Sequence, residues 1–209
     1  MAGRAHAPRL PLGRVQGHRR WAGVNGAEVI MAGFGGQGVM AMGMLLAYAG
    51  MKEGRHVSWM PSYGPEMRGG TANCAVVVSD LPIASPLITE PTAVIAMSLP
   101  SLDKFEGWLV SSGLLVVNVS LVHRPVVRQD IRLIRVPATD IALELGSDRV
   151  ANMVALGAYV AASGVVELET VAASLQDALP PHRHHLIPLN RQALDRGAGY
   201  ACGVSTGSM

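Results

Sequence analysis

The chain has 209 residues, of which 49% are hydrophobic and 15% are charged, which suits one domain with a sizeable core and with surface to bury against partners. The net charge is +2, but residues 1–26 hold five arginines and no acid, which leaves 12 basic and 15 acidic residues in the remainder. Nucleic-acid binding is therefore not expected, and two cysteines are too few for a four-thiolate iron–sulfur cluster or zinc site.

Apolar segments bounded by glycine, proline and polar residues predict strands at residues 28–33, 55–60, 71–79, 93–97, 114–118 and 131–136. Helices are predicted at residues 37–51, 100–108, 137–145, 152–165, 167–179 and 188–196. Residues 83–85 follow a turn and are expected to pair back on 71–79 as a β-hairpin, and Gly197 is expected to end the last helix. Strands that alternate with helices predict a three-layer α/β/α fold with a mainly parallel sheet and one β-hairpin.

The folded domain is predicted over residues 27–197. Residues 1–26 are expected to be a disordered basic extension, with a transit-like segment as the alternative, and residues 198–209 a flexible C-terminal tail. No charge occurs between Val29 and Met51, but six glycines and Gln37 in that stretch favour a strand, a turn and a buried helix over a membrane span. We expect a cytoplasmic protein with free thiols and no membrane or metal site, because nothing in the sequence indicates secretion.

The segment Gly33-Phe34-Gly35-Gly36-Gln37-Gly38 fits the pattern G-x-G-x-x-G and lies between a predicted strand and a predicted helix. Glycines there let the backbone approach an anionic group, and the helix N-terminus offers free N–H donors. A nicotinamide or flavin dinucleotide would also need an acid near the end of the second strand, where residues 57–60 contain none. The motif itself leaves two interpretations open: an anion site, or glycines that only permit tight packing.

The connection at residues 61–74 has the sequence PSYGPEMRGGTANC. It follows the carboxyl end of a predicted strand, where ligands bind in open α/β sheets. Polar side chains on a loop that contains two prolines suit recognition, and the guanidinium of Arg68 suits a phosphate or a carboxylate. The alternative is a solvated connection with a surface pair between Glu66 and Arg68.

Together, the glycine turn and the 61–74 segment resemble the gamma subunit of 2-oxoacid:ferredoxin oxidoreductases. The similarity covers residues 28–197 and includes further segments at 83–86, 97–105, 113–118, 137–142, 149–153 and 185–190. The form Glu66-Met67-Arg68-Gly69-Gly70 is more similar to the 2-oxoglutarate or branched-chain type than to the pyruvate type. The resemblance implies the fold of the gamma domain of pyruvate:ferredoxin oxidoreductase, and a subunit of an oxidoreductase complex with 2-oxoglutarate as the expected substrate (a 2-oxoglutarate synthase).

Enzymes of this family convert a 2-oxoacid and coenzyme A to an acyl-CoA and CO₂ and reduce ferredoxin. The resemblance implies that thiamine diphosphate, Mg²⁺ and iron–sulfur clusters are held by partner subunits called alpha, beta and, in some complexes, delta, since this chain has no Gly-Asp-Gly motif and only two cysteines. It gives this chain no catalytic residue. A coenzyme A contact is expected at Gly33, Gly35, Gly36, Gln37, Gly38 and Arg68. A second set is expected to face the active site or partner subunits: Ser62, Tyr63, Gly64, Pro65, Glu66, Met67, Gly69, Gly70 and Asn73.

Two alternatives stay open at this point. In the first alternative, the chain is a stand-alone dinucleotide-binding α/β oxidoreductase, against which the missing acid argues. In the second, it is a scaffold subunit that binds no ligand, and substitutions at Gly35 or Gly38 then act through stability alone.

Overall fold

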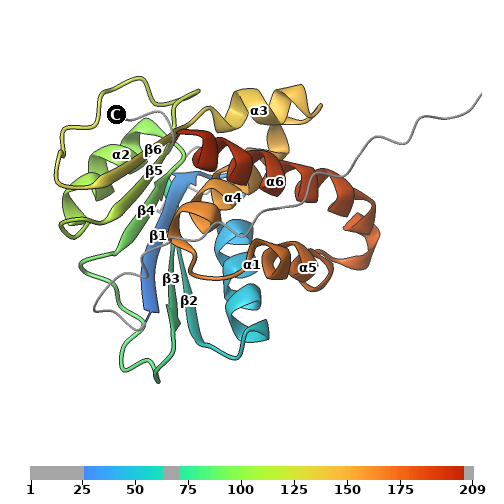
Figure 1. Cartoon of the computed structure of the whole chain (residues 1–209), viewed down its shortest axis with the longest axis horizontal. Helices are drawn as coiled ribbons and strands as arrows, with labels where there is room; N and C mark the ends of the chain where they lie inside the picture. The colour runs from blue at the N-terminus through green and yellow to red at the C-terminus, as the bar shows by residue number, and fades with distance from the viewer. Residues whose placement is uncertain (1–25, 64–70, 205–209) are drawn as a thin grey trace, which may run out of the picture.

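A mixed six-stranded sheet forms the centre of the computed structural model, which describes residues 26–63 and 71–204 (Figure 1). Its strands are β1 Gly26–Phe34, β2 His56–Tyr63, β3 Thr71–Ser79, β4 Ala93–Ala96, β5 Leu114–Asn118 and β6 Arg132–Val136. The α-helices are α1 Val39–Lys52, α2 Leu99–Phe105, α3 Ala138–Glu144, α4 Ala151–Ser163, α5 Leu168–Ala178 and α6 Ile187–Val204. Short 3₁₀ helices are η1 Glu106–Trp108, η2 Asp148–Val150 and η3 Pro181–Leu186. The predicted three-layer α/β/α architecture is confirmed.

The strand order β2-β3-β1-β4-β5-β6 brings the two segments selected from the sequence to one edge of the sheet. Within the described sheet, β3 alone runs in the opposite direction, antiparallel to both β1 and β2. The carboxyl ends of the other strands and the amino end of β3 therefore share one edge, the carboxyl edge. There Phe34 pairs with Thr71, and Ala72 pairs with Gly33 on one side and Tyr63 on the other.

The hairpin prediction had the wrong partner strand. Residues 83–85 form no strand, and β3 pairs with all of β2 instead. Residues 61–63, predicted to be loop, continue β2 and pair with β3. Val57, Trp59 and Pro61 lie on one face of the sheet and Ser58 and Met60 on the other, so the alternation of faces extends past the predicted end of the strand. The hairpin connection therefore spans residues 64–70, which lie outside the described residues.

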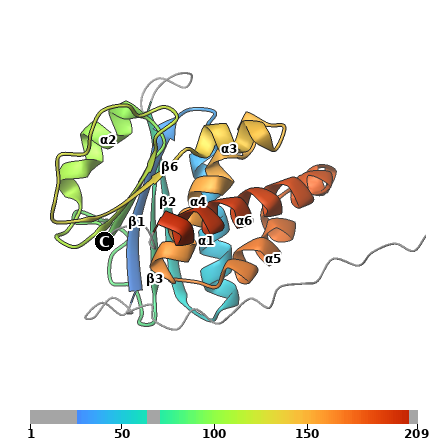
Figure 2. The same ribbon diagram turned by 45° about the horizontal axis from the view of Figure 1, so that its top comes forward.

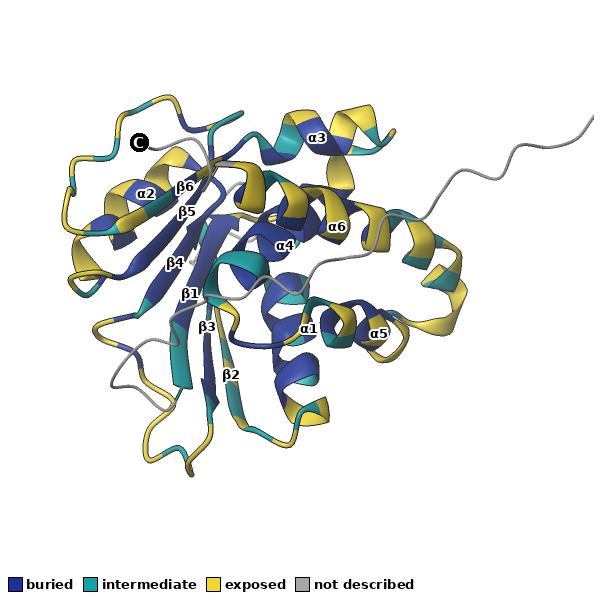
Figure 3. Ribbon diagram, in the orientation of Figure 1, coloured by how far each residue is buried: buried dark blue, intermediate teal, exposed yellow. Residues whose placement is uncertain are grey.

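The two faces of the sheet are covered unequally. Helices α1, α3, α4, α5 and α6 contribute to an apolar cluster on one face, whereas α2 and the residues after η1 cover the other. Figures 1 and 2 show α1, α4, α5 and α6 on one side and α2 on the opposite side. Figure 3 shows β4 and β5 buried, whereas β2 carries exposed and half-buried residues. The β2–β3 hairpin therefore has α1 on one face and no helix of the described residues on the other.

Helix α6 continues past Gly197 to Val204, so the predicted end of this helix was wrong. A Cβ on Gly197 would lie 1.9 Å from the Val154 carbonyl oxygen, and one on Gly157 would lie 2.1 Å from the Leu194 carbonyl oxygen. The two glycines thus let α4 and α6 cross in backbone contact, which is why glycine does not act as a cap here. Residues 198–204, predicted to begin the tail, are helical, while residues 1–25 and 205–209 lie outside the described residues. Neither α6 nor any other helix in the described part combines the length and apolarity needed to cross a bilayer.

Candidate functional site

The glycine turn joins β1 to α1 at the carboxyl edge and is closed by Gln37. The Gln37 amide donates to the Phe34 carbonyl oxygen at 3.1 Å, and the Phe34 amide donates to Gln37 Oε1 at 2.7 Å. Gly36 and Gly38 have φ of +98° and +71°, a region that side-chain-bearing residues rarely adopt. The turn therefore requires glycine at these two positions for its backbone conformation.

Contacts from two other elements hold the turn in place. Gln37 Nε2 donates to the Met97 carbonyl oxygen at 3.3 Å, which links the turn to the residue after β4. Asn152, 5% exposed in the first turn of α4, donates from Nδ2 to the Gly38 carbonyl oxygen at 3.1 Å. A Cβ on Gly33 would lie 2.5 Å from Gln37 Oε1, and one on Gly38 would lie 2.4 Å from Asn152 Nδ2. The packing interpretation therefore holds for Gly33 and Gly38.

Gly36 has different surroundings. No atom lies within 4 Å of the position its Cβ would take, and Phe34, Gly35 and Gly36 are exposed. The first turn of α1 follows directly, and the N–H groups at a helix N-terminus carry a partial positive charge. Open backbone beside a helix N-terminus fits an anionic group such as a phosphate of coenzyme A in charge and in space.

The turn lies where the connections of the sheet diverge. The chain leaves β1 toward α1 on one face and leaves β4 toward α2 on the opposite face. In open α/β sheets, ligands bind outside the carboxyl ends of strands at such a switch point. The bond from Gln37 to Met97 spans this point, so the glycine turn lies at the position where the fold itself favours a ligand.

Ser98, which precedes α2 two residues after β4, and Asn118, the last residue of β5, have structural roles. The Ser98 and Ser101 hydroxyls form a buried hydrogen bond at 2.8 Å. Asn118 Oδ1 accepts from the amides of Ala138 at 3.1 Å and Thr139 at 3.4 Å, and so holds the first turn of α3. Both side chains serve the scaffold at the carboxyl edge rather than a ligand.

The strand order also bears on the dinucleotide alternative. A dinucleotide-binding fold places the strand after the first helix beside the first strand, where its terminal acid reaches the ribose. Here β3 separates β2 from β1, and residues 56–63 contain no acid. The dinucleotide alternative is therefore not favoured.

The second predicted set divides between the hairpin strands and the connection. Ser62 in β2 pairs with Asn73 in β3, and both side chains lie on the face opposite α1; Ser62 is exposed and Asn73 is half-buried. Tyr63 ends β2. The remaining members lie outside the described residues: Gly64, Pro65, Glu66, Met67, Gly69 and Gly70, and with them Arg68. The roles of this set stay predictions.

Sequence reasoning missed Asn152 as a residue of the site. Its segment, 149–153, was noted only as part of the family resemblance, and its bond to Gly38 spans 114 residues of chain. Arg149 in η2 lies one helical turn earlier, is exposed and forms no ion pair with any described residue.

Glu106 organises a polar cluster away from the glycine turn. Its carboxylate accepts from Arg124 Nη2 at 2.8 Å and from the amides of Val127 at 2.6 Å and Arg128 at 3.1 Å. Burial acts to raise the pKa of Glu106, but the Arg124 guanidinium and the two amides outweigh it and lower this pKa overall. All three bonds go to residues 124–128, so the carboxylate holds this segment in place and is not available for chemistry.

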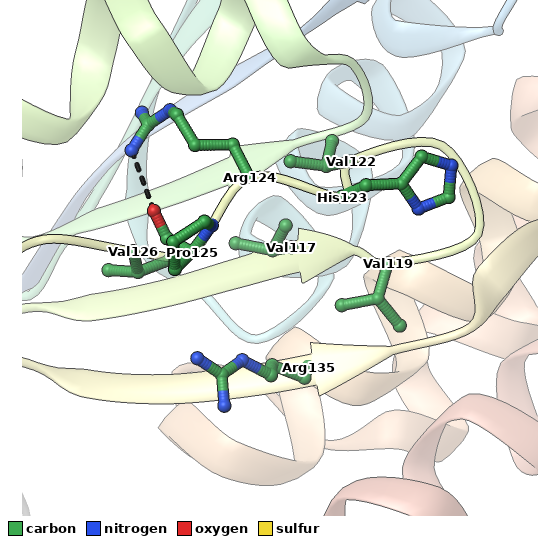
Figure 4. Close-up of a pocket in the computed structure, with 8 residues that line it drawn as sticks. All are labelled: Val117, Val119, Val122, His123, Arg124, Pro125, Val126 and Arg135. Carbon is green, nitrogen blue, oxygen red and sulfur yellow. Dashed lines mark hydrogen bonds between the residues drawn. The ribbon is translucent and has the colours of Figure 1, made fainter.

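A hollow of about 360 Å³ lies near the ends of β5 and β6 (Figure 4). It is lined by Val117, Val119, Val122, His123, Arg124, Pro125, Val126 and Arg135. Figure 4 shows Arg124 turned toward the Pro125 carbonyl oxygen, and this arginine also pairs with Asp103 and Glu106. None of the predicted site residues lines this hollow. Elsewhere in residues 26–63 and 71–204, no three His, Cys, Asp or Glu side chains are grouped so that they could hold a metal ion.

Both cysteines are free, and they differ in reactivity. Cys74 is buried in β3, and burial raises the pKa of its thiol to about 12. Since the thiolate is the reactive form, Cys74 is an inert core thiol. Cys202 in α6 is exposed.

Comparison with known proteins identifies the family. The sequence profile described as pyruvate ferredoxin/flavodoxin oxidoreductase matches residues 28–200. A 2-oxoglutarate synthase subunit KorC from Methanothermobacter marburgensis is 36% identical over 161 residues, which are 74% of this chain and 87% of that protein. The keto/oxoacid ferredoxin oxidoreductase gamma subunit from Geobacter sulfurreducens superposes with a TM-score of 0.74 at 30% identity, covering 85% of this chain and 99% of that one.

A second group of relatives is longer. The ketoisovalerate oxidoreductase subunit VorA from Methanothermobacter marburgensis is 40% identical over 177 residues, which are 83% of this chain but 36% of that protein. The chain thus spans about a third of the length of these relatives. The resemblance to gamma subunits inferred from the glycine turn and the 61–74 segment is confirmed, and the chain belongs to the pyruvate ferredoxin/flavodoxin oxidoreductase family.

Proposed function

We propose that this chain is the gamma-type subunit of a cytoplasmic complex that oxidatively decarboxylates a 2-oxoacid with coenzyme A and reduces ferredoxin. The observation that carries the proposal is the family match over residues 28–200, together with gamma-type relatives of which the chain covers most of the length. In this proposal, alpha and beta subunits, with a delta subunit in some complexes, hold thiamine diphosphate, Mg²⁺ and the iron–sulfur clusters. The chain itself supplies no catalytic residue.

Its own contribution is to bind a phosphate-bearing part of coenzyme A. The open backbone at Gly36, the N-terminus of α1 and the switch-point position of the turn support this role. Arg68 lies in the connection between β2 and β3, and the paired strands bring both ends of that connection to the carboxyl edge. We propose that Arg68 supplies the guanidinium that contacts the same anion.

Two substrates are candidates, and each has support from relatives. The 2-oxoglutarate expectation agrees with the KorC relatives, whereas the VorA relative, at 40% identity, favours 2-oxoisovalerate (ketoisovalerate). A pocket for the 2-oxoacid is expected mostly on the partner subunits, so the side chains of this chain do not decide between the two.

The test is purification of the tagged full-length chain under anaerobic conditions, followed by assay with each 2-oxoacid, coenzyme A and a ferredoxin substitute. The expected result is recovery of thiamine- and iron–sulfur-containing subunits that reduce the ferredoxin substitute in a coenzyme A-dependent way. The 2-oxoacid that gives the higher activity is then the substrate. A chain that purifies alone with a bound dinucleotide would contradict the proposal.

The coenzyme A contact needs its own variants. Gly36→Ala should raise the coenzyme A KM by at least about fivefold and leave the 2-oxoacid KM unchanged, because it adds a side chain where the backbone meets the anion. Gly146→Ala, two residues after the end of α3, is the matched control, with φ of +92° and equally open surroundings. Arg68→Ala is expected to act like Gly36→Ala, with Arg183→Ala as its control. Equal coenzyme A kinetics in all four variants would favour the scaffold alternative.

A further inference from the structure

The outer face of the β2–β3 hairpin has no covering helix in the described residues. This hairpin face consists of the side chains of β2 and β3 that point away from α1: Ser58, Met60, Ser62, Thr71, Asn73 and Ala75. Ser62 is exposed and the others are half-buried. The face continues onto β1 at Phe34, which pairs with Thr71 and is 37% exposed.

The chemistry of the hairpin face is unusual for a surface in water. It contains no charged side chain, and none of the eight residues of β2 is Lys, Arg, Asp or Glu. Solvent-facing sheet surfaces and edge strands normally carry charges, which keep them soluble and prevent unwanted pairing. The centre of a surface that is covered in an assembly is depleted of charged side chains, and the hairpin face shares this lack of charge.

The layering of the fold leads to the same conclusion. Figures 1 and 2 show α1 alongside β2 and β3 on one side, while α2 lies by β4 and β5 on the other. The outer side of the hairpin therefore lacks the third layer that the rest of the sheet has. Such a sheet gains stability when another polypeptide supplies that layer.

The relatives indicate what supplies it. In the VorA protein, the region similar to this chain makes up 36% of the length, so the same domain occurs there within a much longer polypeptide. We propose that the hairpin face docks against the partner subunit that corresponds to the remaining part of a VorA-type chain, through an uncharged surface of small polar side chains around Met60. This inference rests on the proposed function, because it requires that the chain works within an oxidoreductase complex.

A second copy of this chain is the competing occupant, and β2 argues against it. Edge-to-edge pairing of two sheets needs an unbroken row of outward N–H and C=O groups. Pro61 lies within β2 and has no N–H, and prolines in edge strands face their missing donor outward. The hairpin is therefore suited to packing by its face and poorly suited to continuing the sheet into another copy.

The experiment compares variants of the full chain, each purified with its partners under anaerobic conditions. Met60→Arg and Ser58→Arg place a charge on the hairpin face, whereas Met51→Arg places the same charge at a methionine that is 61% exposed at the end of α1. Thermal unfolding of each isolated chain checks that it is folded. Quantitative mass spectrometry then measures how much of the partner subunit that matches the remaining part of a VorA-type chain is recovered per mole of this chain.

Met60→Arg and Ser58→Arg should each reduce partner recovery by at least about tenfold, because an unpaired charge would be buried, while Met51→Arg should stay within about twofold of the original chain. Slower amide hydrogen exchange in residues 56–63 in the complex than in the free chain would agree with this result. Folded variants that keep full recovery would overturn the hairpin face as the docking surface and leave the proposed function intact. An original chain that recovers no partner would defeat the proposed function, and a homodimer that Met60→Arg converts to a monomer would identify a second copy as the occupant.

Discussion

Asn152 donates a hydrogen bond to the carbonyl oxygen of Gly38 and so connects the first turn of α4 to the residue that precedes α1. The Gly38 carbonyl oxygen also accepts from the Met42 amide at 3.0 Å, so it is shared between its own helix and a distant one. The position of the glycine turn is therefore set by α4 as well as by β1.

Asn152→Ala should lower the free energy of unfolding by about 1–2 kcal/mol, because the carbonyl oxygen of half-buried Gly38 loses one donor. It should also raise the coenzyme A KM if the turn binds that ligand. Asn190→Ala is the matched control, since Asn190 is also buried and donates to a backbone carbonyl, that of Leu186, but within its own part of the chain. Urea unfolding and steady-state kinetics measure the two effects. Changes in KM of equal size in both variants would show that Asn152 acts through stability alone.

Gly38→Ala should lower the free energy of unfolding by more than Gly54→Ala. Both glycines have φ near +70°, so each alanine pays a backbone strain of about 1–2 kcal/mol. At Gly38 the new Cβ would also meet Asn152 Nδ2 at 2.4 Å, whereas at Gly54 nothing lies within 4 Å. The difference between the two variants, about 1–3 kcal/mol in urea unfolding, measures the crowding. Equal losses would mean that Asn152 moves aside freely.

Alanine substitutions at Gly197 and Gly199, two positions apart in α6, test the close crossing of α4 and α6. Gly197→Ala should destabilise the chain by more than about 3 kcal/mol, because the Val154 backbone cannot move away without separating the helices. Gly199→Ala, with open space around its Cβ position, should instead stabilise the chain by about 0.5–1 kcal/mol through helix propensity. Thermal and urea unfolding report both. A stabilising Gly197→Ala would refute the close crossing.

Glu106→Gln should destabilise the chain by about 2–4 kcal/mol at neutral pH, since it breaks a buried, charge-assisted cluster. The pKa of Glu106 is lower in the folded chain than its ordinary value of 4.5, so the carboxylate stabilises the fold above pH 4.5, and this stabilisation is lost as the pH falls below it. The difference in the free energy of unfolding between the original chain and the variant should therefore become smaller as the pH falls below 4.5. Glu144→Gln is the control, because its ion pair with Arg196 is exposed and contributes less than about 1 kcal/mol. A difference that does not change with pH would contradict the ionised role.

Local patterns were enough to predict most of the elements and the two segments of the candidate site. The strand at 114–118 agrees at both ends with β5, because glycine and asparagine bound an unbroken apolar run. The hairpin partner and the end of α6 were wrong because each depends on distant backbone. By local pattern, β3 could pair with the strand before it or with residues 83–85 after it. Gly197 has the sequence signature of a helix cap, and only its contact with the Val154 backbone explains why it lies inside a helix instead.

The same reason explains why the site was predicted incompletely. Gln37 was recognised because it lies inside the glycine motif, but its bond to Met97 was not, and Asn152 lies on a helix whose sequence shows only an apolar run. The uncharged hairpin face was visible in the sequence as strand residues without charge, but which side α1 covers required the register of β2 on β3.

The position of β1 in the sheet also has a consequence for synthesis on the ribosome. β1 emerges first among the described strands, yet both of its neighbours, β3 and β4, are translated later, after α1 and β2. The apolar strand Gly26–Phe34 must therefore wait unpaired while these segments are made, and α4 and α6 complete its buried side last. A newly made chain will expose the centre of its own sheet until translation is nearly finished, so protection by a chaperone matters most during that interval.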